Sequence, residues 1–92
     1  MARGEVQLED SNFKVTKWII EPGDAIEMHV HEYDYVVVPL VNQTMHVVNG
    51  DGSEFDANLE VGVSYTRQAG VEHRVENHGS EVVEFIEVEK LS

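Results

Sequence analysis

The sequence predicts an all-β domain, built as a sandwich or a closed barrel. Turn-forming residues divide the chain into segments of about five to eight residues that are rich in β-branched and aromatic side chains. No stretch of about 10–12 residues has a clear 3.6-residue apolar period, which argues against a long helix. Short strands at regular spacing are typical of sandwiches and barrels, in which few sheet edges remain exposed.

Eight segments have this strand composition, and each is bounded by a turn signal. In chain order they are Phe13–Ile20, Glu27–His31, Tyr35–Val41, Thr44–Val48, Glu54–Leu59, Val63–Arg67, Glu72–Glu76 and Val82–Val88. The clearest turns between them are Glu21-Pro22-Gly23-Asp24, Asn42-Gln43, Asn49-Gly50-Asp51-Gly52-Ser53, Gly62, Ala69-Gly70 and Asn77-His78-Gly79-Ser80. In the last strand polar and apolar residues alternate, which assigns the acidic residues of this region to a solvated outer face: Glu81, Glu84, Glu87 and Glu89.

The length of 92 residues predicts one domain with a small core. Residues 1–12 are polar and are interpreted as an N-terminal arm, either flexible or exchanged with a partner in a dimer. Residues 13–92 form the single barrel. The chain has no Cys, so no disulfide stabilises this core, and the absence of Cys suits a reducing cytoplasm. A metal ion or a partner subunit is the expected substitute.

The charge balance excludes several classes of partner. Six Lys and Arg residues stand against eighteen Asp and Glu, for a formal net charge of −12. Nucleic-acid binding requires clustered cations, and these six are scattered along the chain. No apolar run approaches the roughly 20 residues of a membrane span, and no signal peptide is evident. We therefore expect a cytoplasmic protein with a small-molecule ligand.

Two histidines indicate a metal site. His29 and His31 are two positions apart on a predicted strand, so their imidazoles share one face, roughly 7 Å apart. Both rings can then reach one ion at about 2.1 Å. Such a pair is a weak signal alone, because surface strands also carry it, and ordinary hydrogen-bonded barrel histidines remain the alternative.

A second, distant pattern strengthens the metal interpretation. Gly62 is followed after five residues by Gln68-Ala69-Gly70, then by His73 and Asn77, and the histidine pair itself follows Gly23 by five residues. The two patterns together resemble the paired motifs of the cupin superfamily. This resemblance spans Gly23 to Asn77 and implies a small cupin double-stranded β-helix, a jelly-roll barrel.

The chain departs from the family pattern at several positions. Gln68 replaces a proline, and Asn42 stands where a glycine is expected. The carboxylate that follows the histidine pair in the family is missing, since Tyr35 occupies its place. Strand parity points Tyr35 inward and Asp34 outward, although a β-bulge would exchange them. We therefore expect a three-histidine site of His29, His31 and His73, lined or weakly ligated by Tyr35.

The resemblance implies an enzyme that acts on a small organic acid or related metabolite, of metal-dependent oxygenase or isomerase/lyase type. Imidazole donors do not distinguish among Zn, Ni, Fe, Mn and Cu. Tyr35 is the candidate acid/base or orienting group. Arg67 is a candidate anchor for a substrate carboxylate, or else forms a salt bridge with Asp34, Glu72 or Glu84. The alternatives are a non-catalytic ligand-binding cupin and a metal-free, isomerase-like cupin. The resemblance to small cupins also implies that the protein is a homodimer.

Overall fold

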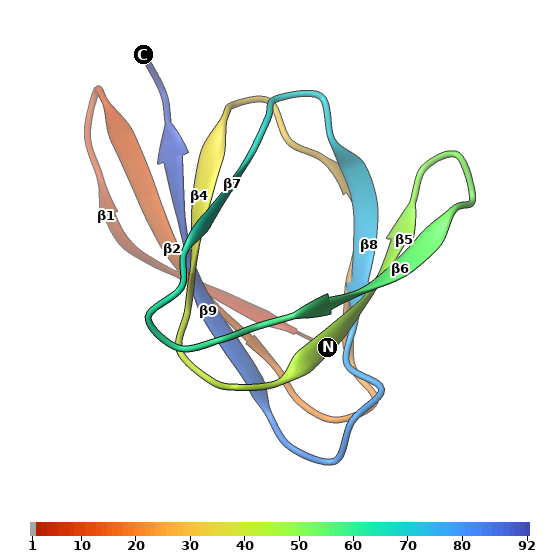
Figure 1. The fold of residues 1–92 in the computed structure, drawn as a ribbon. Helices are drawn as coiled ribbons and strands as arrows, with labels where there is room; N and C mark the ends of the chain where they lie inside the picture. The colour runs from red at the N-terminus through yellow and green to blue at the C-terminus, as the bar shows by residue number, and fades with distance from the viewer. Residues whose placement is uncertain (1) are drawn as a thin grey trace.

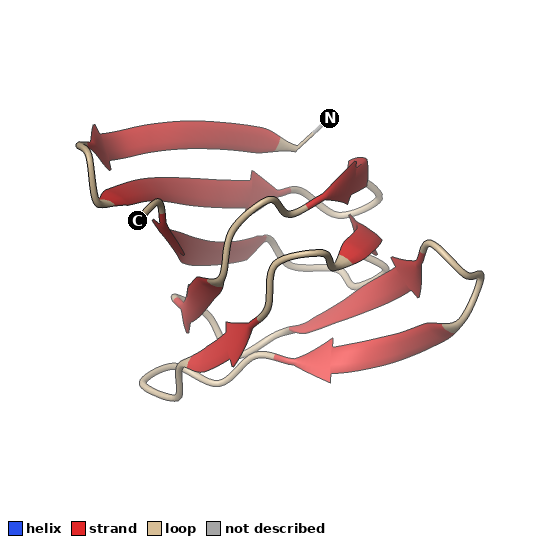
Figure 2. Ribbon diagram, turned by 90° about the horizontal axis from the view of Figure 1, so that it is seen from above, coloured by secondary structure: helices blue, strands red, loops and turns tan. Residues whose placement is uncertain are grey.

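The structure, a computed structural model, describes residues 2–92 and confirms the all-β prediction. These residues form nine strands and contain no helix that could span a lipid bilayer (Figure 2). The strands are β1 (Arg3–Glu9), β2 (Phe13–Ile20), β3 (Ala25–Val30), β4 (Tyr35–Pro39), β5 (Thr44–Asn49), β6 (Glu54–Asn58), β7 (Tyr65–Arg67), β8 (Glu72–Glu76) and β9 (Val83–Lys90).

Two antiparallel sheets face each other across the interior, as in a jelly-roll barrel (Figure 1). One has the strand order β1-β2-β9-β4-β7 and the other the order β3-β8-β5-β6. Strands that are distant in the chain are therefore neighbours in space. The two predicted motifs meet in this way, because β3 pairs with β8.

Alternation along each strand builds the core between the sheets. In β4, Tyr35, Val37 and Pro39 are buried while the residues between them are partly exposed. In β9, Val83, Phe85 and Glu87 are the buried positions. The apolar core cluster consists of Ile20, Ile26, Tyr35, Val37, Met45, Leu59, Val75, Val83 and Phe85.

The structure adds a strand that the sequence did not predict. Residues Arg3–Glu9, within the region interpreted as an arm, form β1 and pair antiparallel with β2. All seven residues of β1 are exposed, so the strand carries no buried apolar alternation that could have revealed it. Met1 lies outside the described residues. The arm thus extends the five-stranded sheet at its edge.

A β-bulge in β3 determines which side chains of that strand face the interior. Ile26 pairs with Val75, and His29 pairs with His73, so β3 holds one more residue than β8 over this interval. The extra residue leaves both Glu27 and Met28 exposed. Ile26 and His29 consequently both point inward, although they are three positions apart.

Candidate metal centre

Three imidazole nitrogen atoms converge at one end of the barrel interior. His29 Nε2 lies 3.0 Å from His31 Nε2, and His31 Nε2 lies 3.1 Å from His73 Nε2. One ligand atom from each of these three residues lies within 4.8 Å of the others, and they are the group within residues 2–92 that could hold a metal ion. The structure therefore brings together the three histidines that the two motifs indicated.

The backbone fixes the positions of all three rings. His29 and His73 are direct cross-strand partners in β3 and β8. His31 lies just beyond the end of β3, where its backbone N–H donates to Val71 (2.9 Å) and its carbonyl accepts from Gly70 (2.8 Å). Gly70 has a φ of +95°, a conformation that favours glycine. The turn before β8 thus holds the second histidine of the pair against the third.

The hydrogen bonding of His29 orients its Nε2 toward the centre. Its Nδ1 lies 2.7 Å from the backbone carbonyl oxygen of Glu27, which can only accept a hydrogen bond. Nδ1 is therefore the donor in this contact, and Nε2 is the nitrogen that faces the other two histidines. This is the arrangement by which metal-binding histidines are commonly oriented.

Two of the histidines at the centre are held in their neutral form. Burial, followed by the proximity of His29 and His73, lowers the pKa of His31 to about 4. Burial, followed by the charges of His29 and Arg67, lowers the pKa of His73 to about 4. Neutral imidazoles are the form that binds a metal ion, so both residues are ready to act as donors at neutral pH.

Tyr35 packs directly against this group. Its ring stacks on that of His31, with 3.9 Å between the centroids and 20° between the planes. The side chain is 3% exposed, and its hydroxyl finds no hydrogen-bond partner among the described residues. Burial, with the nearby Glu87 carboxylate, raises the pKa of Tyr35. Asp34, by contrast, accepts a hydrogen bond from the backbone of Ala69 (2.8 Å) and lies on an exposed loop.

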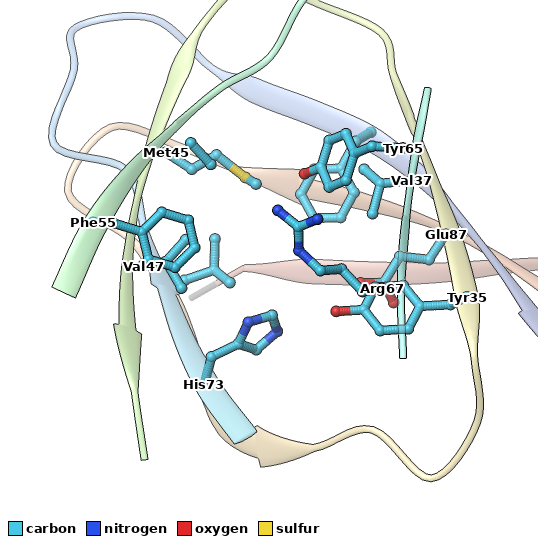
Figure 3. A pocket seen from close by; sticks show the side chains of 12 residues that line it. Tyr35, Val37, Met45, Val47, Phe55, Tyr65, Arg67, His73 and Glu87 are labelled. Atoms are coloured by element: carbon cyan, nitrogen blue, oxygen red, sulfur yellow. The ribbon is translucent and has the colours of Figure 1, made fainter. Parts of the chain in front are cut away.

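Arg67 extends into the cavity that His73 also lines, as Figure 3 shows. Its guanidinium lies over the ring of Tyr65, 4.6 Å from the centroid, and donates to the carbonyl of Thr66 (3.0 Å). Within residues 2–92 it forms no salt bridge with a carboxylate, so the expected alternative of a pair with Asp34, Glu72 or Glu84 is wrong. The cavity is small, with a volume of about 30 Å³.

Glu87 lies in the interior of the barrel. The prediction that it belongs to the solvated outer face is wrong. The residue is 7% exposed and lines the cavity. Trp18 Nε1 donates to one carboxylate oxygen (3.2 Å), and the other lies 3.9 Å from His31 Nε2. Burial raises the pKa of Glu87 to about 7, although the hydrogen bond from Trp18 opposes this shift. The alternation Val83, Phe85, Glu87 was the available signal.

Comparisons with known proteins place the chain in a family, although no protein-family profile matches it. A crystal structure of a cupin domain from Bordetella pertussis is 37% identical in sequence, with a TM-score of 0.94. The match covers 99% of this chain and 94% of that one. This chain belongs to the cupin superfamily. A cupin structure from Methanocaldococcus jannaschii, 13% identical with a TM-score of 0.81, shares the double-stranded β-helix fold; 98% of this chain and 80% of that one are covered.

Two curated proteins resemble this cupin in sequence. The β-alanine degradation protein BauB of Pseudomonas aeruginosa is 40% identical over 84 residues, which cover 91% of this chain and 87% of BauB. Oxalate decarboxylase OxdC of Bacillus subtilis is 35% identical over 99 residues. That match covers 95% of this cupin but 25% of OxdC, so the likeness is to one portion of a longer protein.

Proposed function

We propose that this cupin is a metal-dependent enzyme that acts on a small organic acid. The observation that carries the proposal is the convergence of three imidazoles, since His29, His31 and His73 would hold a divalent ion. The unpartnered hydroxyl of Tyr35 beside them also fits a polar occupant. An ion held by three neutral donors keeps its full charge and open positions, and can polarise a substrate oxygen or activate water.

The residues around the centre support an acidic substrate. Arg67 is free of a carboxylate partner within the described chain, and its planar guanidinium suits a bidentate contact with a substrate carboxylate. Because the cavity is small and Arg67 lines it, a substrate would displace the Arg67 side chain from Tyr65 as it enters. Oxalate and β-alanine, which occur in the names of the two relatives, are both small molecules with a carboxylate.

Tyr35 is the residue that we assign to orienting the substrate or exchanging a proton with it. Its hydroxyl is buried at the cavity without a partner, so an entering oxygen atom would gain a hydrogen bond there. Burial keeps this phenol protonated at neutral pH because its pKa is raised. The group therefore acts as a hydrogen-bond donor in the resting site.

The test is turnover of a panel of small carboxylic acids, oxalate and β-alanine among them, by protein purified without a metal resin. We expect an activity that a chelator abolishes, that a divalent ion restores, and that His73→Ala lacks. Arg67→Met should raise KM for acids more than it lowers kcat. Full activity in the metal-free protein would contradict the proposal. A ligand that raises the melting temperature without being altered would instead indicate a binding module.

We also propose that two copies of the chain pair through the outer face of the five-stranded sheet. The registers place Leu8, Val15, Val88 and Val36 in one row across β1, β2, β9 and β4. Tyr35 and Glu87, the neighbours of Val36 and Val88, are buried, so this row points outward. An apolar row across four strands suits a second copy of the same surface. The small core of a 92-residue chain would gain stability from the apolar area that such pairing buries.

A further inference from the structure

Glu87 is a buried carboxylate without a cation in the part of the chain that the structure describes. Its side chain is 7% exposed. One oxygen accepts the hydrogen bond from Trp18 Nε1 (3.2 Å), while the other faces His31 Nε2 at 3.9 Å. No Lys or Arg within residues 2–92 forms a salt bridge with it. Burying a carboxylate in this way is costly unless an opposite charge is nearby, so the site lacks a positive charge.

The distance between Glu87 and His31 is compatible with one ion shared by Glu87 and the histidines. If each ligand atom lies about 2.1 Å from the ion, no two of them can be more than about 4.2 Å apart. The His29–His31 and His31–His73 separations of 3.0 and 3.1 Å meet this limit, and so does the 3.9 Å between Glu87 Oε2 and His31 Nε2. The carboxylate lies outside the compact group of three nitrogen atoms, and rotation about its side-chain bonds is the movement that would bring it in.

The strand that carries Glu87 lies beside the strand from which a carboxylate is missing. β9 pairs with β4, where Glu87 is the partner of Val37 and Glu89 the partner of Tyr35. Glu87 and Tyr35 both line the cavity, and Figure 3 shows them next to each other on the same side of it. Tyr35 in turn stacks on His31. A carboxylate from β9 thus reaches the region that a ligand in the Tyr35 position would occupy.

We propose that Glu87 is the fourth protein ligand of the ion held by His29, His31 and His73, and that it replaces from β9 the carboxylate absent from the first motif. This inference rests on the metal site of the proposed function. The Trp18 N–H holds one carboxylate oxygen, which leaves the other for the ion. The ion would then join the two sheets, because the histidines belong to the β3 and β8 side and Glu87 to the other.

The experiment compares Glu87→Gln with Glu84→Gln, a matched control. Gln keeps the size of the side chain and an oxygen to accept from Trp18, but it removes the charge. Glu84 is on the same strand with the opposite orientation and pairs with Lys17 (3.3 Å), so its substitution removes the same charge from the outer surface. Zn²⁺ and Co²⁺ affinities are measured on chelator-stripped protein by competition with a chromophoric chelator, and the absorption spectrum of the Co²⁺ form reports the ligands.

We expect Glu87→Gln to weaken binding of both ions at least about tenfold and to alter the Co²⁺ spectrum, whereas Glu84→Gln stays within twofold of the parent protein. An unaltered affinity and spectrum in Glu87→Gln, while His73→Ala loses the ion, would overturn this inference and leave the proposed function intact. Failure of the parent protein to bind either ion would overturn both.

Melting of the metal-free proteins shows whether Glu87→Gln folds and supplies a second readout. Without an ion we expect this variant to melt at the same temperature as the parent protein or higher, because a buried unpaired charge has been removed. With saturating Zn²⁺ the parent protein should melt higher than the variant. An increase in melting temperature with Zn²⁺ that is equal in both proteins would contradict ligation by Glu87.

Discussion

Tyr35 and Glu87 place polar atoms inside the barrel that would be stabilised by a further polar group. The Tyr35 hydroxyl is buried without a partner, and the Glu87 carboxylate is buried with one hydrogen bond from Trp18. A barrel that only had to be stable would place apolar groups at both positions. We therefore expect both residues to reduce the stability of the metal-free chain.

Tyr35→Phe should stabilise the metal-free protein while impairing its activity. Removing a buried hydroxyl without a partner is expected to raise the free energy of unfolding by about 1 kcal/mol. Urea denaturation in the presence of a chelator measures this change. Tyr33→Phe, at an exposed tyrosine, is the control and should have no effect. A loss of stability in Tyr35→Phe would show that the hydroxyl has a partner in solution.

His46, on the outer face of the four-stranded sheet, should make the stability of the folded protein depend on pH. Hydrogen bonds to Glu54 (2.6 Å) and Asp56 (2.9 Å) raise the pKa of His46. Glu76 faces it from β8 and the ring of His78 stacks on it. Because the folded pKa is above the unfolded value of about 6.5, the contribution is complete below that pH and is lost as the pH rises through the folded pKa.

The measurement for His46 is the difference in melting temperature between the parent protein and His46→Gln at pH 6 and at pH 8.5. We expect a larger difference at pH 6, where the imidazolium forms both ion pairs. Titration of His46 by NMR should give a pKa above 6.5. Equal differences at the two pH values would show that the ion pairs contribute nothing to folding, as many exposed pairs do.

At the single-residue level, spacing identified the histidines but not the carboxylate beside them. The distances from Gly23 to His29 and from Gly62 to His73 depend on local sequence and were readable. The buried position of Glu87 was not predicted because the chain has eighteen acidic residues, and each of them is most simply assigned to the solvated surface. Its place in the buried series after Val83 and Phe85 contained the information, yet an acidic residue at a core position contradicts the ordinary preference.

At the level of elements, the turn between β8 and β9 depends on one buried amide. Asn77 is 1% exposed, and its side-chain nitrogen donates to the carbonyls of Ile20 (2.9 Å) and Glu81 (2.8 Å). Its oxygen accepts from Gly79 N–H (2.9 Å). One side chain thus connects the end of β2 to the turn that follows β8, the strand that carries His73.

Asn77→Ala should destabilise the protein by about 3 kcal/mol, because it removes three hydrogen bonds, of which the one to Ile20 is buried and the other two are partly buried. Chemical denaturation measures this loss. Asn58→Ala is the control: Asn58 is exposed and accepts one hydrogen bond from Thr44, so we expect a loss of less than about 1 kcal/mol. Equal effects at the two positions would contradict a structural role for the buried amide.

Among the elements, strands with one buried face were predictable, and those without were not. β4 and β9 alternate clearly in sequence and structure alike. β1 has no buried residue, and only its pairing with β2 makes it a strand. The bulge in β3 was also unpredictable, since it depends on the register with β8 rather than on its own residues.

At the level of the whole molecule, the two sheets have unlike outer faces. The four-stranded sheet carries charged and polar groups outside, among them His46, Glu54 and Asp56. The five-stranded sheet carries the row from Leu8 to Val36 described above. A contiguous apolar row on one side of a small acidic protein is typical of an interface.

Replacing Leu8 and Val88 by Lys should convert the proposed dimer into a monomer, because each copy would bring these charges into the apolar interface. Light scattering coupled to size-exclusion chromatography measures the mass. A double replacement of Val61 and Val63, which are both exposed in a loop, adds the same charge and should leave the dimer intact. A monomeric parent protein at micromolar concentration would contradict the proposal.

The direct pairing of His29 with His73 has a consequence for protein design. The main-chain ladder of β3 and β8 sets the separation of these two rings, so the placement of His29 against His73 depends on the strands and not on loops elsewhere in the barrel. The loop around Val61 can therefore be lengthened, shortened or exchanged with those of other barrels. This chain offers a frame onto which new entrances and new selectivities can be grafted while its coordinating atoms stay in place.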